Sequence, residues 1–219
     1  MRTGYLGTTL GAGAALLVLA QGAAADPISG ALGEIKPIIE ARLRYENVDQ
    51  LGVASTANAL TARLRAGVQT GKAWNTSLLA EVGWVGALED AYRADNAVVG
   101  VRTTYPVVAD PKEFVINRLQ LTNTSIANTT ITLGRQRINL DDQRFVGNVG
   151  WRQNEQTFDA LRVVNTGINK LTIDTTYVES VNRIYGPDSP QSPYYGSSWL
   201  LNLASVSYTH LTLPTKRIV

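Results

Sequence analysis

The feature that most constrains the fold of this chain is an alternation of polar and apolar residues with a period of two. It is clearest in residues 60–69 (LTARLRAGVQ), where apolar residues alternate with a row that carries Arg63 and Arg65. Residues 41–46 and 77–84 repeat the pattern, and weaker examples follow at residues 115–122, 129–136, 158–164, 171–177 and 198–204. Because successive side chains of a strand point to opposite faces, the sequence predicts an all-β chain of about eight strands.

The connections between these segments alternate in length. Short, turn-forming stretches occur around residues 70–72, 123–128 and 166–169, whereas residues 47–59, 90–112, 137–157 and 180–197 form long connections. Long loops without regular structure are uncommon inside compact soluble domains. An outer-membrane β-barrel, by contrast, has short turns on its periplasmic side and long loops outside. The alternation therefore favours an antiparallel transmembrane β-barrel in which every long connection lies at the outer end.

The composition is compatible with such a barrel and excludes several other classes. The charged fraction of 17% is below the ~25% usual for soluble domains. A mean hydropathy of -0.05 is nevertheless too polar for a bundle of membrane helices. The absence of cysteine excludes a disulfide scaffold, cysteine-ligated zinc and thiol catalysis. A net charge of only +2 argues against a dedicated nucleic-acid binder.

Periodicity alone leaves open what each face of the strands meets. In a secreted β-sandwich the charged face would meet bulk water, whereas in a barrel it would line an aqueous lumen and the apolar face would meet lipid. Aromatic residues at strand ends, such as Tyr45, Trp74 and Trp84, fit the interfacial girdles of a barrel but also ordinary sandwich packing.

The N-terminus has the pattern of a secretory signal peptide. Arg2 precedes an apolar stretch at residues 10–20 (LGAGAALLVLA), and three alanines at residues 23–25 precede Asp26. The apolar stretch is shorter than the ~20 residues of a membrane-spanning helix. We therefore expect a signal-peptide helix in residues 1–25 that is removed on export, and residues 26–205 to be the N-terminal part of the barrel.

The C-terminus is of a different kind. Residues 206–219 (VSYTHLTLPTKRIV) resemble an in-frame translation of a transposon-derived sequencing-library adapter. The alternative is a further β-strand. On the first interpretation the tail is not native, the remaining strands of the barrel are missing, and the only histidine, His210, has no part in function.

Enzymatic chemistry has little support in the sequence, and we expect a protein that is not an enzyme. A catalytic histidine would have to be His210, which lies in the doubtful tail. Asp141, Asp142 and Glu155 could supply glycosidase carboxylates, although a solvated acidic loop explains these residues as well. They could also bind calcium, but no EF-hand spacing is present. We expect neither a metal site nor a cofactor.

Arginine is the more informative residue type. Arg42, Arg44, Arg63, Arg65, Arg118 and Arg162 all fall on the polar faces of the predicted strands. A guanidinium group suits bidentate contact with a carboxylate. A lumen lined in this way would guide an anionic solute, with Glu40, Glu46, Glu81 and Asp174 preventing it from binding too tightly. An equally good explanation of these arginines is that they pair with acidic residues of neighbouring strands and the charges neutralise one another.

One stretch of the sequence resembles a known family. Residues 133–163 (LGRQRINLDDQRFVGNVGWRQNEQTFDALRV) are similar to the central region of the bacterial alginate-export porins. The likeness consists of Gly134-Arg135-Gln136, a loop with Asp142, Arg144 and Phe145, then Trp151-Arg152-Gln153 and Phe158-Asp159-Ala160. Residues 40–47 (EARLRYEN) and 117–121 are also similar to that family, and the likeness weakens after Tyr177.

The resemblance implies a monomeric outer-membrane barrel of roughly eighteen strands, in contact with membrane lipid. Its arginine-rich constriction would pass an anionic polysaccharide or related sugar acid without a cofactor. Carried over by motif, Arg135, Arg137, Arg144 and Arg152 would lie at or near the selectivity region, and residues 137–157 would fold toward the pore. With about eight strands and no closing strand, the polypeptide as given should not insert as a complete pore, because unpaired edges in lipid are costly.

The sequence thus predicts part of an outer-membrane porin of the alginate-export type, with alginate itself, other anionic polysaccharides and small sugar acids all open as solutes. The alternative from another class is a secreted β-sandwich that binds carbohydrate through the aromatic loop at residues 185–199. A more distant alternative is a polysaccharide-degrading enzyme that uses Asp141, Asp142 or Glu155.

Overall fold

We analysed a computed structural model of the protein, which describes residues 26–95 and 97–205. The predicted signal peptide (residues 1–25), the tail (residues 206–219) and His210 lie outside the described residues. Within them the chain is all-β apart from one short helix, α1 (Pro27–Gly33). The predicted fold class is thereby confirmed at the level of an all-β chain.

Eight strands follow the helix and form one antiparallel sheet in the order of the sequence. They are β1 (Lys36–Val48), β2 (Ala57–Gln69), β3 (Thr76–Ala91), β4 (Glu113–Asn123), β5 (Thr129–Gln136), β6 (Thr157–Ile168), β7 (Leu171–Asn182) and β8 (Tyr194–Ser205). Each segment of period-two alternation lies inside one of these strands. In the described part of the chain β1 and β8 are the edges of the sheet, so it is open.

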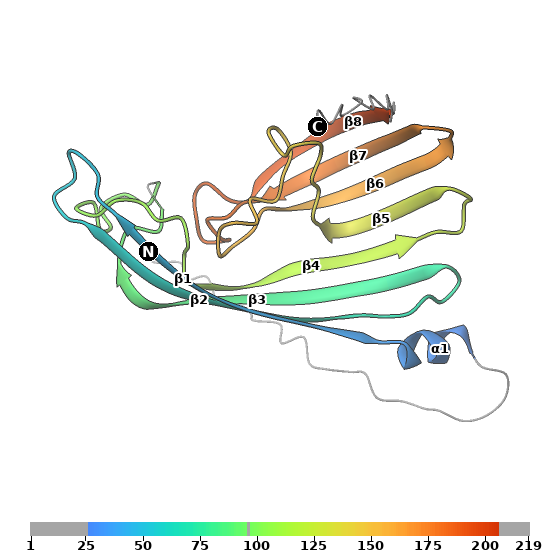
Figure 1. The fold of residues 1–219 in the computed structure, drawn as a ribbon, viewed down its shortest axis with the longest axis horizontal. Helices are drawn as coiled ribbons and strands as arrows, with labels where there is room; N and C mark the ends of the chain where they lie inside the picture. Colours follow the sequence, from blue (N-terminus) through green and yellow to red (C-terminus); the bar gives the residue numbers. More distant parts are fainter. Residues whose placement is uncertain (1–25, 96, 206–219) are drawn as a thin grey trace, which may run out of the picture.

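The predicted alternation of connections is also present. The turns that join β2 to β3, β4 to β5 and β6 to β7 lie at one end of the curved sheet, and the four longer connections lie at the other (Figure 1). Residues 92–112 and 137–156 form the two longest connections. We call residues 137–156, between β5 and β6, the inner loop, because they fold back over one face of the sheet.

The helix α1 was not predicted, although its capping residues are visible in the sequence. Asp26 is the N-cap, and its side chain accepts a hydrogen bond from the backbone nitrogen of Ile28. Pro27 occupies the first turn, where a missing N–H costs nothing. In the described residues no helix is long and apolar enough to cross a membrane.

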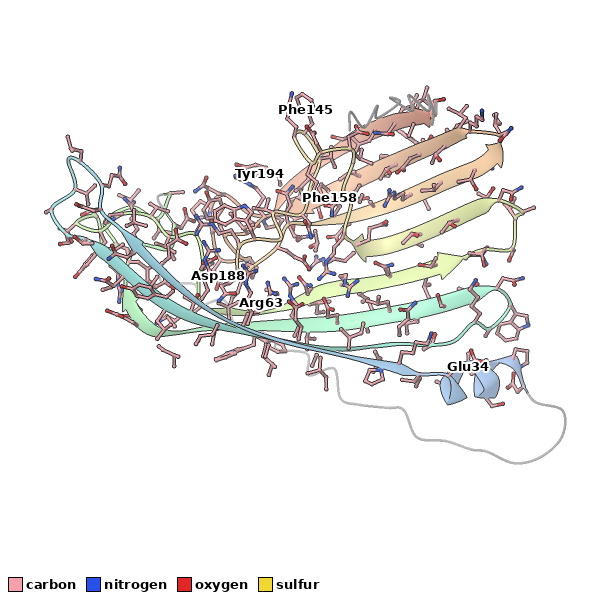
Figure 2. All side chains as sticks on the ribbon, viewed as in Figure 1. Glu34, Arg63, Phe145, Phe158, Asp188 and Tyr194 are labelled. Carbon is pink, nitrogen blue, oxygen red and sulfur yellow. The ribbon has the colours of Figure 1, made fainter. Side chains whose placement is uncertain are left out.

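The two faces of the sheet differ sharply in burial. We call the face that carries Arg63, Arg65 and Glu81 the inner face, and the opposite face, which carries Leu43, Leu64 and Trp84, the outer face. The long connections cover part of the inner face, where small apolar clusters form beneath them (Figure 2). Ala57 and Ala59 of β2 pack with Tyr92 and Val108, whereas Phe158, Ala160 and Val178 pack with Ile138 of the inner loop. The outer face has no such cover in the described residues.

The register between β4 and β5 is incomplete. Only Leu119–Asn123 of β4 pairs with β5, so the first half of β4 has no partner on that side within the described chain. Gly134 in β5 has a positive φ of 110°, a conformation that side chains rarely adopt. The two strands therefore diverge toward the end of the sheet that carries the long loops (Figure 1).

Candidate functional site

The inner face is a continuous band of charged and amide side chains. In β1 and β2 the register places Glu40 opposite Arg65 and Arg42 opposite Arg63. Glu81 of β3 lies opposite Arg118 of β4. In β1 and β2 these positions alternate with apolar residues, so the period-two pattern brings them to one face as predicted. In β4 a register shift against β3 brings both Asn117 and Arg118 to this face.

Two buried carboxylates, those of Glu81 and Glu155, form the centre of this band, and their side chains are each 1% exposed. Arg118 holds Glu81 with two contacts, Nη2 to Oε2 at 2.6 Å and Nε to Oε1 at 3.1 Å. The amide nitrogen of Asn117 donates to Glu81 at 2.5 Å and to Glu155 at 2.6 Å. A strand residue and a loop residue are thereby tied together through one amide.

Arginines from both sides neutralise Glu155. Arg137 Nη2 lies 2.6 Å from Glu155 Oε1, and Arg65 Nη1 lies 3.4 Å from the same oxygen. Asn148 of the inner loop donates to the other oxygen at 3.0 Å. Burial by itself would lower the pKa of Arg137, but the hydrogen bond and the charge of Glu155 raise that pKa above its usual value. Arg137 therefore stays a cation.

Strand arginines also hold the backbone of the inner loop. Arg42 and Arg44 each donate to the carbonyl oxygen of Trp151 at 2.6 Å. Arg63 donates to the carbonyl oxygen of Gln153 at 3.2 Å and forms an ion pair with Glu40. The inner loop thus lies against the inner face of β1 and β2.

Gln153 of this loop has no exposed surface. Its side-chain nitrogen donates to the carbonyl and hydroxyl oxygens of Thr61 at 3.0 and 2.9 Å. Its backbone nitrogen donates to Asp110, at 2.9 Å. Because Asp110 belongs to the β3–β4 connection, the two longest connections are joined at this point.

A second charged cluster lies beside Trp151. The guanidinium groups of Arg152 and Arg44 lie 4.1 and 4.9 Å from the centre of the Trp151 ring. Arg152 also contacts Glu46 at 3.1 Å, and Arg44 is paired with the same carboxylate. Cation–π contacts and ion pairs together fix the ring of Trp151, which remains half exposed.

The strands β5 to β7 carry two further ion pairs. Arg135 holds Asp159 through two contacts of 2.8 and 2.9 Å, and Ser180 donates to the same carboxylate at 2.7 Å. Arg162 holds Asp174 through Nε and Nη2. The nitrogen Nη1 of Arg135 also donates to the carbonyl oxygen of Ile116 at 3.2 Å, so its side chain spans the divergence between β4 and β5.

The structure therefore distributes the ten arginines singled out in the sequence over three locations. Six lie on the inner face, Arg135 lies at the divergence of β4 and β5, and Arg137, Arg144 and Arg152 belong to the inner loop. Within the described residues all except Arg42 form at least one ion pair with a carboxylate. Arg144 is paired with Asp142 in an exposed part of the loop. In the part of the chain that the structure describes, these ten arginines contact eight different carboxylates, which leaves an excess of two positive charges.

Several residues of the site were not singled out for function from the sequence. Asn117 and Gln153 fell within the stretches that resemble the porin family, but their amides gave no separate signal. Asp110 and Thr61 were missed because only the fold shows that a loop inserts between them. The three acids considered for catalysis have different surroundings: Asp142 is exposed, Asp141 accepts a hydrogen bond from Asn202, and Glu155 is buried.

A cavity of about 260 Å³ adjoins this band where β4 and β5 diverge. Arg63, Arg65, Arg135 and Glu155 line it together with residues of the β7–β8 connection. A second cavity of about 300 Å³ lies between the β3–β4 and β7–β8 connections. Residues 26–95 and 97–205 contain no group of three or more acidic or histidine side chains suited to a metal ion.

Asp95 joins these two connections. Its carboxylate accepts hydrogen bonds from Ser189 and, at 2.6 Å, from Gln191. Burial alone would raise the pKa of Asp95, but the hydrogen bonds from Ser189, the backbone of Ala97 and Gln191 lower it below its usual value. The ionised form therefore holds the loops together.

No family model matches the chain, and no curated protein matches it in sequence.

Proposed function

We propose that this chain forms part of the wall of an outer-membrane channel of the alginate-export type, which passes anionic polysaccharide or sugar acids without a cofactor. The observation that carries the proposal is the reversed burial of the two faces. Leu43, Phe114 and Trp199 on the outer face are 65%, 67% and 72% exposed, whereas Arg63, Arg65 and Glu81 on the inner face are 4%, 4% and 2% exposed.

A face of this kind is unfavourable in water. Burying apolar surface is worth about 25 cal/mol per Å², and contiguous exposed apolar patches of this extent mark interaction or membrane surfaces. The exposed outer-face residues include Ile39, Leu43, Leu64, Trp84, Phe114, Ile116, Leu119, Leu121, Leu133, Trp199, Leu201 and Leu203. Contact with lipid acyl chains would remove this whole face from water.

The strands are long enough to span the hydrocarbon core of a membrane. A transmembrane β-strand needs about 9–11 residues, and seven of the eight strands have between 11 and 16 residues. In the described chain the edge strands β1 and β8 each pair with a neighbouring strand on one side only. A closed wall in lipid therefore requires further strands, because unpaired backbone groups in the membrane each cost several kcal/mol.

The preference for anions rests on the arginines. Most are paired, so they would act as a fixed array with a small positive excess instead of a row of free cations. Such an array lowers the electrostatic barrier for an anion without holding it tightly. A secreted sandwich that binds sugar at residues 185–199 would instead bury its apolar face against a second sheet, and the described strands form a single sheet.

The location is tested by fractionating cells that express the protein from its genomic locus. We expect it in the outer-membrane fraction, with an electrophoretic mobility that changes on heating. Recovery as a soluble periplasmic protein would contradict the proposal.

The selectivity is tested in planar bilayers. Replacing Arg65 and Arg135 with glutamine should shift the reversal potential in a salt gradient toward lower anion selectivity. The control is Lys72→Gln, which removes a cation from a short turn at the opposite end of the sheet. If the reversal potential shifts as much in Lys72→Gln as in the arginine variants, Arg65 and Arg135 do not lie along the conducting path.

A further inference from the structure

The cavity where β4 and β5 diverge contains a cation whose hydrogen-bonding capacity is not used. The side chain of Arg65 is 5% exposed, and its two ion pairs, with Glu40 and Glu155, are long, at 3.5 and 3.4 Å. Within the described residues its guanidinium group forms no hydrogen bond. Arg118 and Arg135, in contrast, each grip a carboxylate with two short contacts.

A buried guanidinium group that forms no hydrogen bonds is unfavourable, because its five N–H donors were hydrated in the unfolded chain. Both carboxylates near Arg65 are engaged more closely elsewhere, Glu40 with Arg63 and Glu155 with Arg137. The cavity beside Arg65 is therefore the place from which an additional acceptor can approach.

The remainder of the cavity wall suits a hydroxylated ring. Asn117 uses its amide nitrogen on Glu81 and Glu155, and Asn182 uses its amide nitrogen on Asp159. Both asparagines line the same cavity, and within the described residues the carbonyl oxygens of their amides accept no hydrogen bond. Val85 and Val115 supply an apolar patch beside them.

The charge and the size of the cavity narrow the class of ligand. Four arginines and two glutamates line it, so its wall has a positive excess. Its volume of about 260 Å³ is slightly below the ~300–1,000 Å³ of pockets for drug-sized ligands. A single sugar ring fits a space of this size.

We propose that this cavity is a binding site for one monosaccharide-sized sugar acid, with its carboxylate on Arg65 and its hydroxyl groups on the side-chain carbonyl oxygens of Asn117 and Asn182. This inference rests on the proposed function and deepens it, because it makes the channel a facilitator with a saturable site for small sugar acids.

The test is calorimetric titration of the full-length protein, which is expressed from its genomic locus and purified in detergent. D-galacturonate is the anionic probe, and D-galactose is its neutral counterpart. We expect saturable binding of galacturonate only. Arg65→Gln should weaken it about tenfold or more, since a charge-assisted hydrogen bond is lost. The matched control, Arg102→Gln, removes an exposed arginine outside this cavity and should bind as the wild type does.

A second variant keeps the test informative if Arg65→Gln does not fold. Val115→Phe fills the cavity without removing an ion pair, and it should also abolish galacturonate binding. Equal binding of galacturonate by the wild type and both variants would overturn the inference, as would its absence in the wild type. A protein that conducts chloride across bilayers but does not bind galacturonate contradicts only this inference. One that binds galacturonate but does not conduct contradicts only the proposed channel.

Discussion

Removing the buried carboxylate of Glu155 should destabilise the protein far more than removing an exposed one. Glu155 contacts Arg137 and Asn117 at 2.6 Å and Asn148 at 3.0 Å, and its side chain is 1% exposed. Breaking a buried ion pair by deleting one partner costs about 3–5 kcal/mol, because the other charge stays buried. Arg137 is 30% exposed and recovers some hydration, so we expect Glu155→Ala to lie at the lower limit, about 3 kcal/mol.

The matched control is Asp142→Ala. Asp142 is paired with Arg144 at 3.4 Å in the same loop, but the two side chains are 65% and 73% exposed. An exposed pair of this kind contributes about 0–1 kcal/mol. The two variants therefore remove one carboxylate each from the inner loop and differ mainly in burial.

The assay is reversible urea unfolding of the full-length protein in lipid vesicles, followed by tryptophan fluorescence. The midpoint for Glu155→Ala should fall well below that of the wild type, with an unchanged slope, while Asp142→Ala stays close to the wild type. Equal midpoints for the two variants would show that the buried charges do not hold the inner loop in place.

Three further outcomes are expected. Leu64→Arg on the outer face should destabilise the protein in vesicles by about 2–4 kcal/mol, whereas Leu51→Arg, at a fully exposed position in the β1–β2 connection, should change stability little; equal effects in urea titrations would argue against a lipid-facing surface. Gln153→Ala removes two side-chain hydrogen bonds to Thr61 and should speed proteolysis within the inner loop; an unchanged cleavage rate would contradict its anchoring role. Because the folded pKa of Asp95 lies below its unfolded value near 3.8, the stability it contributes is present above that pH and is lost as the pH falls through the folded pKa. Amide exchange, corrected for its intrinsic pH dependence, should therefore show less protection of residues 183–193 at pH 2 than at pH 6, and an Asp95→Asn variant should lack that difference.

The strands were predictable because their pattern is local. Every predicted segment lies within an observed strand, and the main error is in length: β3 extends to Ala91, although the alternation was followed only to Trp84. Beyond Trp84 the chain reads VGALEDA, in which small residues weaken the pattern. The helix α1 was missed because seven residues carry little periodicity.

The candidate site was predictable only in part. The positions of Arg63 and Arg65 on one face follow from the period of a strand, and the resemblance directed attention to the inner loop. The partners of these residues did not follow, because Gln153 meets Thr61 and Asp110 only after residues far apart in sequence have come together. The divergence of β4 and β5, which creates the cavity at Arg65, likewise depends on register and not on local pattern.

In the proposed channel the outer face meets lipid, whereas the inner loop does not. Trp84 lies on the outer face and Trp151 in the inner loop, and both are about half exposed, at 46% and 56%. Single-tryptophan variants of the full-length protein, with the other tryptophans replaced by phenylalanine, can be folded into vesicles of lipids brominated on the acyl chains. We predict strong quenching of Trp84 fluorescence and little quenching of Trp151. Equal quenching of the two, or no quenching of Trp84, would contradict the account.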